Sequence, residues 1–182
     1  IEGLFEKKDM QGQPVYRLRE EGHDPGKDLM QVGLCCYYPN KESFEWMREQ
    51  GFRYQTRAEG EERGWPDVME DIISEAKDGP EYLFISFDID VMDPAYTPAT
   101  GTPEPNGLTP RETFPLIRRL CAESNVVGFE LVELLPYRVP GYETVLNSER
   151  IVRECLVGIT MRKKGIADKA YLAPLTVDDN RK

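Results

Sequence analysis

Short, mostly apolar runs of strand length alternate along this chain with longer segments whose apolar residues recur at helical spacing. The strand-length runs are residues 29–38, 52–56, 82–87 and 126–135. The segments with helical spacing are residues 40–51, 66–79, 109–121 and 143–164. An unbroken apolar run is typical of a strand buried on both faces, and a period near 3.6 indicates an amphipathic helix. Strands that alternate with helices in this way predict an α/β fold with a mostly parallel sheet.

The two ends of the chain lack a strong apolar period. Residues 1–28 are polar and contain several glycines, so we expect a loop or the remnant of an upstream region there, and residues 165–182 form a tail. Residues 29–164 then form the α/β domain. The chain begins with Ile1 and holds a single histidine, His23, which we expect at the surface. We therefore expect this sequence to be part of a longer polypeptide.

Acidic residues outnumber basic ones by 33 to 23, which gives a net charge of −10 at pH 7. This charge repels phosphate backbones and anionic membranes, so we expect no nucleic-acid partner and no membrane partner. The acidic stretch 59–62 is expected to be a loop. No apolar segment approaches the roughly 20 residues that a membrane-spanning helix needs, and the first residues do not form a signal peptide, so a cytoplasmic protein is the expectation. The four cysteines lie in apolar surroundings without a C-x-x-C pair and are expected to be reduced core thiols: Cys35, Cys36, Cys121 and Cys155.

The stretch Ser86-Phe-Asp-Ile-Asp-Val-Met-Asp-Pro94 puts three carboxylates directly after an apolar strand. Ligands of open α/β sheets bind at the carboxyl ends of the strands. Asp88 and Asp90 are two residues apart, so their side chains point the same way as long as the chain stays extended. Neighbouring carboxylates repel each other unless they share a proton or a multivalent cation, and oxygen ligands suit magnesium, manganese or nickel. Asp93 precedes a proline and is expected to shape a turn.

Two other interpretations of this stretch are open. In the first, Asp88 and Asp93 only cap a turn and a helix, although a cap needs a single carboxylate. In the second, a strand that ends in Asp-x-Asp-x-Val resembles the nucleophile motif of haloacid-dehalogenase-type phosphatases, with Asp88 phosphorylated and Asp90 as the acid/base. That motif also needs a Ser/Thr, a Lys and an acidic pair downstream, and only its first half is evident. A calcium loop is excluded, because the third acid stands where an EF-hand needs glycine and Ala99 stands at position twelve.

The loop that follows distinguishes these interpretations. Residues 86–109 run in the order S-x-D-x-D-x-x-D-P, then T-P-A-T-G-T-P, then a glycine-containing turn and Leu-Thr. This order resembles the signature of the ureohydrolase superfamily, which includes arginases, agmatinases, guanidinobutyrases and formimidoylglutamases. Gln31-Val-Gly-Leu34 and Gly128-Phe-Glu-Leu-Val-Glu133 resemble two further strands of that family. The resemblance covers roughly residues 29–160.

The resemblance implies a three-layer αβα fold of the arginase type, with a mostly parallel sheet, of which this chain is the C-terminal portion. It implies two divalent metal ions, manganese or alternatively nickel, which activate a water for attack on a guanidinium carbon. Asp88 matches an aspartate that bridges both ions, and Asp90 matches a catalytic aspartate that chelates one of them. Glu133 matches the glutamate that binds the guanidinium group. A small guanidino substrate is therefore expected, and a homo-oligomer, either a trimer or a hexamer, is the expected assembly.

Several positions depart from the family. The G-G-D-H and D-A-H-x-D stretches, which carry the remaining metal ligands, do not occur in the chain, so it holds two of the six ligands. Either the half of the polypeptide that carries them is absent from this sequence, or the chain is a non-catalytic relative. Asn106 stands where the family has the first of two glycines, and asparagine tolerates the left-handed conformation. Glu130 replaces the usual aspartate three residues before Glu133.

The residues expected beside the substrate's tail differ as well. Where arginases continue the strand into Arg-Asp, this chain has Cys35 and Cys36. A thiol carries no negative charge near pH 7 unless its pKa is perturbed, so recognition of the α-ammonium group of L-arginine is weakened. A substrate pocket edged by Cys36 and Tyr37 suits a small or uncharged tail. Free guanidine, agmatine and guanidino acids are therefore favoured over arginine.

Overall fold

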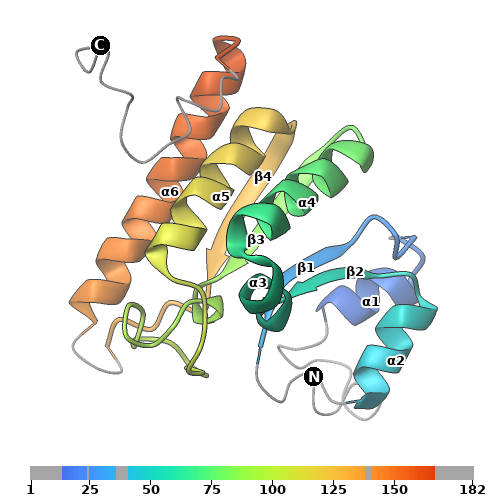
Figure 1. Cartoon of the computed structure of the whole chain (residues 1–182), viewed down its shortest axis with the longest axis horizontal. Coiled ribbons are helices and arrows are strands. Elements are labelled where there is room, and N and C mark those ends of the chain that lie inside the picture. The colour runs from blue at the N-terminus through green and yellow to red at the C-terminus, as the bar shows by residue number, and fades with distance from the viewer. Residues whose placement is uncertain (1–13, 24, 36–40, 138–140, 167–182) are drawn as a thin grey trace.

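The computed structural model describes residues 14–23, 25–35, 41–137 and 141–166 (Figure 1). The helices are α1 (Pro14–Glu20), α2 (Lys41–Glu49), α3 (Arg57–Arg63), α4 (Trp65–Asp78), α5 (Pro110–Glu123) and α6 (Tyr142–Lys163). The strands are β1 (Met30–Leu34), β2 (Arg53–Thr56), β3 (Leu83–Asp88) and β4 (Val126–Val132), and a 3-10 turn, η1 (Ile89–Val91), follows β3. Strands and helices alternate, as the sequence predicts.

The strands form two parallel pairs. Strand β1 pairs with β2, with Met30 opposite Arg53, and β3 pairs with β4, with Asp88 opposite Val132. The two pairs lie side by side in Figure 1, and residues of β1 and β3 pack into the same apolar cluster under α4. The prediction of parallel strands is confirmed, although the described residues form two hydrogen-bonded pairs and not one continuous sheet.

Helices lie on both sides of the strand layer. Alternation along β2 shows this directly, because neighbouring side chains point to opposite faces of a strand. Gln55 donates from its amide to Glu75 of α4 (3.1 Å), whereas the Tyr54 ring meets the Phe44 ring of α2, with centroids 5.5 Å apart. Helices α4, α5 and α6 stand on one side and α1 and α2 on the other (Figure 1), so the three-layer αβα arrangement is confirmed.

Two segments that the apolar pattern does not predict as helices are helical. The acidic residues 59–62 lie in α3, so the prediction of a loop there is wrong. A capping box starts this helix: the Thr56 N–H donates to a Glu59 carboxylate oxygen (2.6 Å), and the Glu59 N–H donates to the Thr56 hydroxyl (3.3 Å). Helix α1 lies within the polar residues 1–28 and is anchored by the Tyr16 ring, 5.1 Å from the Trp46 ring of α2.

The core has its centre on α5, which packs against both of its neighbours. Leu116 and Leu120 join the apolar cluster of α4, whereas Ile117 and Cys121 join the cluster of α6. Cys121 and Cys155 are buried and free, which confirms them as core thiols, and burial raises the pKa of the Cys121 thiol further above neutrality. Cys35 is a free, half-buried thiol.

A buried ion pair links α5 to α6. Glu154 and Arg118 are almost completely buried, and the Arg118 guanidinium donates to one Glu154 oxygen. Arg150 donates to the other Glu154 oxygen at 2.6 Å and stacks over the Phe114 ring. Burial opposes ionisation of Glu154, but the two guanidinium groups outweigh it and hold the pKa of this carboxyl below its usual range. Glu154 is therefore a fully compensated charge.

Candidate metal and substrate site

Three carboxylates meet at the carboxyl ends of β3 and β4. Asp88 is the last residue of β3 and lies opposite Val132, the last residue of β4, so Glu133 follows directly beside it. Asp90 lies in η1, immediately after β3. We refer to Asp88, Asp90 and Glu133 as the carboxylate cluster. Parallel pairing explains why residues 45 positions apart in the sequence come together, because both strands end at the same edge.

The chain does not stay extended through the cluster, so the condition under which strand alternation would place Asp88 and Asp90 on one side is not met. It enters η1 directly after β3, and the Asp88 carboxylate caps this turn by accepting from the Asp90 N–H at 3.1 Å. The Asp90 carboxylate accepts from the Thr102 hydroxyl at 2.8 Å. Asp88 is therefore both a cap and a member of the cluster. The turn, and not strand alternation, brings the two carboxylates together.

The described surroundings of the cluster disfavour the charge of Asp88. Burial raises the pKa of Asp88 to about 7, and the nearby carboxylates of Asp90 and Glu133 raise it as well, while the hydrogen bond from the Asp90 backbone opposes them. Among the described residues, no ion pair joins any of the three carboxylates to a lysine or arginine. A group with such a pKa is half protonated near neutrality, and a cation placed among the three would restore its charge.

Glu133 has an uncommon backbone conformation. Its φ angle is +61°, in the left-handed region that side chains larger than asparagine rarely adopt. The strand ends one residue earlier, and the Leu135 N–H donates to the Ala99 carbonyl at 2.9 Å. A Cβ atom at Gly101 would lie 3.3 Å from a Glu133 carboxylate oxygen. The loop around Ala99 and Gly101 therefore fits closely against Glu133 and holds its side chain at the cluster.

Asp93 organises the loop after the cluster, as the sequence predicts. One of its oxygens accepts from the Ala95 N–H and the other from the Asn106 N–H, both at 2.8 Å. Asn106 is in the left-handed conformation (φ +68°), which confirms that the turn survives without the first glycine. Gly107 cannot be replaced as easily, because a Cβ atom there would lie 2.5 Å from the backbone nitrogen of Asp93.

Two residues beside the cluster received no role from the sequence. Thr102 binds Asp90, and the only sequence signal for it was its place in the T-G-T segment. Glu130 accepts a hydrogen bond of 2.7 Å from the Ser86 hydroxyl, and Ser86 lies two residues before Asp88 on β3. The pair lies on the exposed face of β3 and β4, so the longer side chain that replaces the family's aspartate is held by a neighbouring strand.

Other predicted site residues do not join the cluster. Cys36 and Tyr37 lie outside the described residues. His23 is exposed and lies 3.3 Å from Glu21, which confirms it as a surface residue. Across residues 14–23, 25–35, 41–137 and 141–166, no group of three or more His, Cys, Asp or Glu side chains is arranged so that it could hold a metal ion. None of the described helices is long and apolar enough to cross a membrane.

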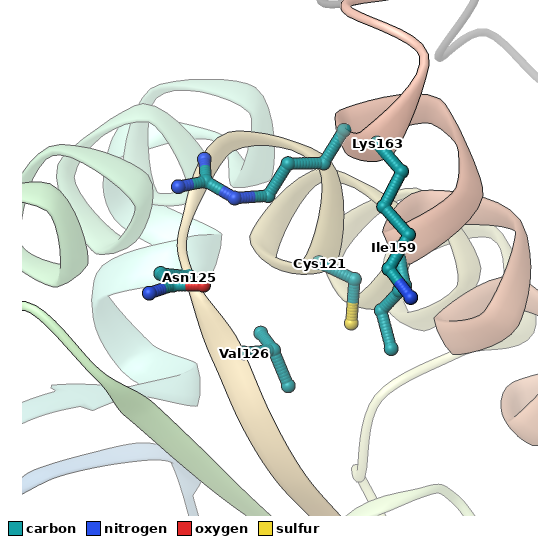
Figure 2. Close-up of a pocket in the computed structure, with 6 residues that line it drawn as sticks. Cys121, Asn125, Val126, Ile159 and Lys163 are labelled. Atoms are coloured by element: carbon teal, nitrogen blue, oxygen red, sulfur yellow. The ribbon is translucent and has the colours of Figure 1, made fainter.

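A pocket of about 360 Å³ lies at the opposite end of β4 (Figure 2). It is lined by Cys121, Asn125, Val126, Ile159, Arg162 and Lys163. Val126 begins β4 and Glu133 follows its end, so the length of the strand separates this pocket from the carboxylate cluster. The pocket contains none of the predicted site residues.

Comparisons with known proteins agree with the resemblance seen in the sequence. The chain is 39% identical over 140 residues to a mitochondrial agmatinase from Gallus gallus and 35% identical over 151 residues to a mitochondrial guanidino acid hydrolase from Homo sapiens. It covers 40% and 41% of these two proteins, which in turn match 75% and 81% of the chain. The chain therefore spans less than half the length of these curated relatives.

The fold is also similar to that of a solved structure. The crystal structure of formimidoylglutamase from Bacillus subtilis superposes with a TM-score of 0.81 at 23% sequence identity, covering 88% of this chain and 51% of that one. A sequence profile described as the Arginase family matches residues 4–158. This match removes the aspartyl-phosphate phosphatase from consideration. From its sequence and from its fold, the chain belongs to the arginase family.

Proposed function

We propose that this chain contributes part of the active centre of a metal-dependent amidinohydrolase, which hydrolyses a guanidine-type C–N bond and releases urea together with ammonia or an amine. The observation that carries the proposal is the carboxylate cluster at the carboxyl ends of β3 and β4, which no lysine or arginine among the described residues neutralises. Elsewhere in the described chain, a buried carboxylate such as Glu154 is paired with arginines. Three carboxylates that are kept together without such partners indicate a functional site, because perturbed pKa values cluster at functional sites.

The donor set suits divalent cations that prefer oxygen ligands. Asp88 and Asp90 would hold two such ions, with manganese as the first choice and nickel as the alternative. When bound, these ions would lower the pKa of the water that attacks the guanidinium carbon. Thr102 orients the Asp90 carboxylate through its hydroxyl, and the Asp90 backbone orients Asp88. Both carboxylates are thus positioned by the protein before any ion arrives.

Glu133 would bind the guanidinium group of the substrate. A carboxylate accepts paired, charge-assisted hydrogen bonds from a planar guanidinium group. The left-handed backbone of Glu133 supports this role, because a strained conformation at the end of a strand persists only where the surroundings enforce it. We assign agmatine or a guanidino acid as the substrate class from the names of the relatives. Free guanidine, and the preference over arginine, rest on Cys35 and Cys36, which stand where arginases have Arg-Asp.

The remaining metal ligands would come from residues that these 182 do not include, since the two histidine-bearing motifs do not occur in the sequence. The same observation favours a second candidate, a non-catalytic arginase-family subunit that keeps the fold. The complete protein would assemble as a homo-oligomer, a trimer or a hexamer. The two candidates differ in whether the complete protein binds two ions per subunit.

Urea release by the complete protein tests the proposal. The protein is incubated with manganese or nickel and with guanidine, agmatine, 4-guanidinobutyrate or arginine, and bound metal is measured in parallel. We expect urea from at least one substrate other than arginine, and a loss of about 100-fold or more in Asp88→Asn and Asp90→Asn together with reduced metal content. Glu45→Gln, an exposed carboxylate of α2, is the control and should change neither quantity. If arginine is the sole substrate, the preference for a substrate with a small or uncharged tail is refuted. The absence of both urea and bound metal would favour the non-catalytic subunit.

A further inference from the structure

The loop between η1 and α5 is anchored by side chains from the first turns of α6. The Ala99 N–H donates to the Thr144 hydroxyl at 2.9 Å, and both residues are completely buried. Asn147, one turn further along α6, donates from its side-chain amide to the Tyr96 carbonyl at 2.9 Å. Figure 1 shows this loop beside the end at which α6 begins. Two side chains of α6 therefore fix the backbone of the loop at Tyr96 and Ala99.

The start of α6 also packs directly on the loop and on the segment that follows Glu133. A Cβ atom at Gly141, the residue before α6, would lie 2.8 Å from the Ala99 Cβ and 3.0 Å from the Pro136 carbonyl oxygen. Both distances are shorter than van der Waals contact, so there is no space for a side chain at this point. The helix, the loop and the segment after Glu133 thus meet at one tightly packed junction.

The anchored loop in turn contacts the unusual backbone at Glu133. Ala99 uses its N–H for Thr144, and its carbonyl accepts from the Leu135 N–H at 2.9 Å, two residues after Glu133. Gly101 fits against the Glu133 carboxylate, because a Cβ atom there would lie 3.3 Å from one of its oxygens. A left-handed φ of +61° persists at Glu133 only where the surroundings enforce it. A shift of Ala99 would therefore reach Glu133 through Leu135.

The Thr144 hydroxyl is the part of this junction that a substitution can remove without changing its shape. Ala99 is completely buried, so its N–H would be left without a partner if the hydroxyl were lost. A buried N–H without an acceptor is costly, and the loop would have to move to satisfy it. The position of the loop, and with it the conformation of Glu133, therefore depends on one hydroxyl group of α6.

We propose that Thr144 is a positioning residue for the substrate: by fixing Ala99, it holds Glu133 in the conformation that binds the guanidinium group. Asn147 supports the same loop at Tyr96 and has a weaker effect, because it is only half-buried. The identity of the group that Glu133 binds rests on the proposed function. The link from Thr144 through Ala99 and Leu135 to Glu133 does not, and it can be measured without catalysis.

Steady-state kinetics of the complete protein test the effect on the substrate. Thr144→Val keeps the shape of the side chain but removes the acceptor of the Ala99 N–H. With agmatine or 4-guanidinobutyrate, whichever releases urea, KM should rise about tenfold while kcat falls less than about threefold, because Glu133 binds the guanidinium group less well. Thr144→Ser keeps the hydroxyl and should return KM to within about threefold of the wild-type value. Thr160→Val is the matched control, since Thr160 is an exposed residue of α6 whose hydroxyl donates to the Leu156 carbonyl, and it should leave KM unchanged.

Hydrogen exchange of the Leu135 N–H, measured without metal or substrate, tests the link itself. Thr144→Val should speed this exchange about tenfold relative to amides in the middle of α5, whereas Thr144→Ser and Thr160→Val should not. Asn147→Ala should speed it about threefold. Circular dichroism checks that each variant folds, and Asn147→Ala carries the test if Thr144→Val does not fold.

The two measurements separate failure of this proposal from failure of the proposed function. Unchanged exchange at Leu135 in Thr144→Val and Asn147→Ala would overturn the positioning role, and so would a Thr144→Ser variant that behaves like Thr144→Val. Faster exchange with an unchanged KM would show that Thr144 supports only the fold of the loop, which also overturns the proposal. A wild-type protein that releases no urea would refute the proposed function, and the exchange of Leu135 would then decide whether Thr144 holds Glu133 in place.

Discussion

Glu154 and Asp88 are both withdrawn from solvent, yet their surroundings act on their charge in opposite directions. Glu154 lies between two guanidinium groups, which hold the pKa of its carboxyl below the usual range. Burial raises the pKa of Asp88 to about 7, and the neighbouring carboxylates of Asp90 and Glu133 raise it as well. The first arrangement supports the packing of α5 on α6, and the second gains nothing for the fold by itself. Compensation of charge therefore separates a structural carboxylate from one held ready for a ligand.

The largest expected effect comes from breaking the compensated pair. Glu154→Ala removes the buried carboxylate that pairs with both Arg118 and Arg150, so we expect the free energy of unfolding to fall by about 3–5 kcal/mol. Urea denaturation followed by circular dichroism measures this. A loss below 1 kcal/mol would mean that Glu154 is no more structural than a surface carboxylate.

Asp93 should give an intermediate effect, because it is a structural carboxylate next to the cluster. Asp93→Ala removes the acceptor of the Ala95 and Asn106 N–H groups, and we expect a loss of about 1–2 kcal/mol in the same denaturation measurement. Asp93→Asn keeps one acceptor oxygen and should lose less. Equal losses in the two variants would contradict the view that both oxygens are used.

The pH dependence of stability should carry opposite signs for the two carboxylates. The pKa of Asp88 rises on folding from 3.8 to about 7, so the folded chain holds a proton that the unfolded chain has released, and metal-free stability should fall between about pH 4 and pH 7. Because Asp88 is partly solvated, we expect a total change of about 1 kcal/mol. For Glu154 the folded pKa is lowered, so its contribution is present above an ordinary value of 4.5 and is lost as the pH falls through the folded pKa.

Denaturation in the presence of a chelator from pH 4 to pH 8 measures this dependence. Asp88→Asn should flatten the change between pH 4 and pH 7 without altering the loss at lower pH. The opposite result is a wild-type chain that becomes more stable as the pH rises from 4 to 7, with the same trend in Asp88→Asn. That result would contradict the raised pKa of Asp88 and mean that another group neutralises the cluster.

The smallest effect is expected for an exposed pair. Glu45 lies 3.6 Å from Lys41 on α2, and both side chains are more than half exposed. Glu45→Gln should change the free energy of unfolding by less than about 0.5 kcal/mol, because solvent screens such pairs. This variant sets the baseline for the other three. A change as large as that of Asp93→Ala would show that denaturation does not resolve the comparison.

The sequence predicted the order and type of most elements, because their apolar periods are strong. It failed for α3, where the acidic composition hid a capping box at Thr56 and Glu59 that is readable in retrospect. It predicted that Asp88, Asp90 and Glu133 belong together, since parallel strands end at a common edge. It could not predict the left-handed Glu133, because that conformation goes with contacts to the loop around Ala99 and Gly101, which is far from Glu133 in sequence.

The two hydrogen bonds of the Asp93 carboxylate act on the loop as a crosslink would. They join Ala95 to Asn106, so the chain between them is closed into a ring whatever its sequence. Closing a longer ring adds only about 0.6 kcal/mol for each doubling of its length. The exposed stretch between Thr102 and Asn106 can therefore gain residues at a small cost in entropy. A lineage could reshape the rim beside the cluster there while Asp93 keeps the carboxylates in place.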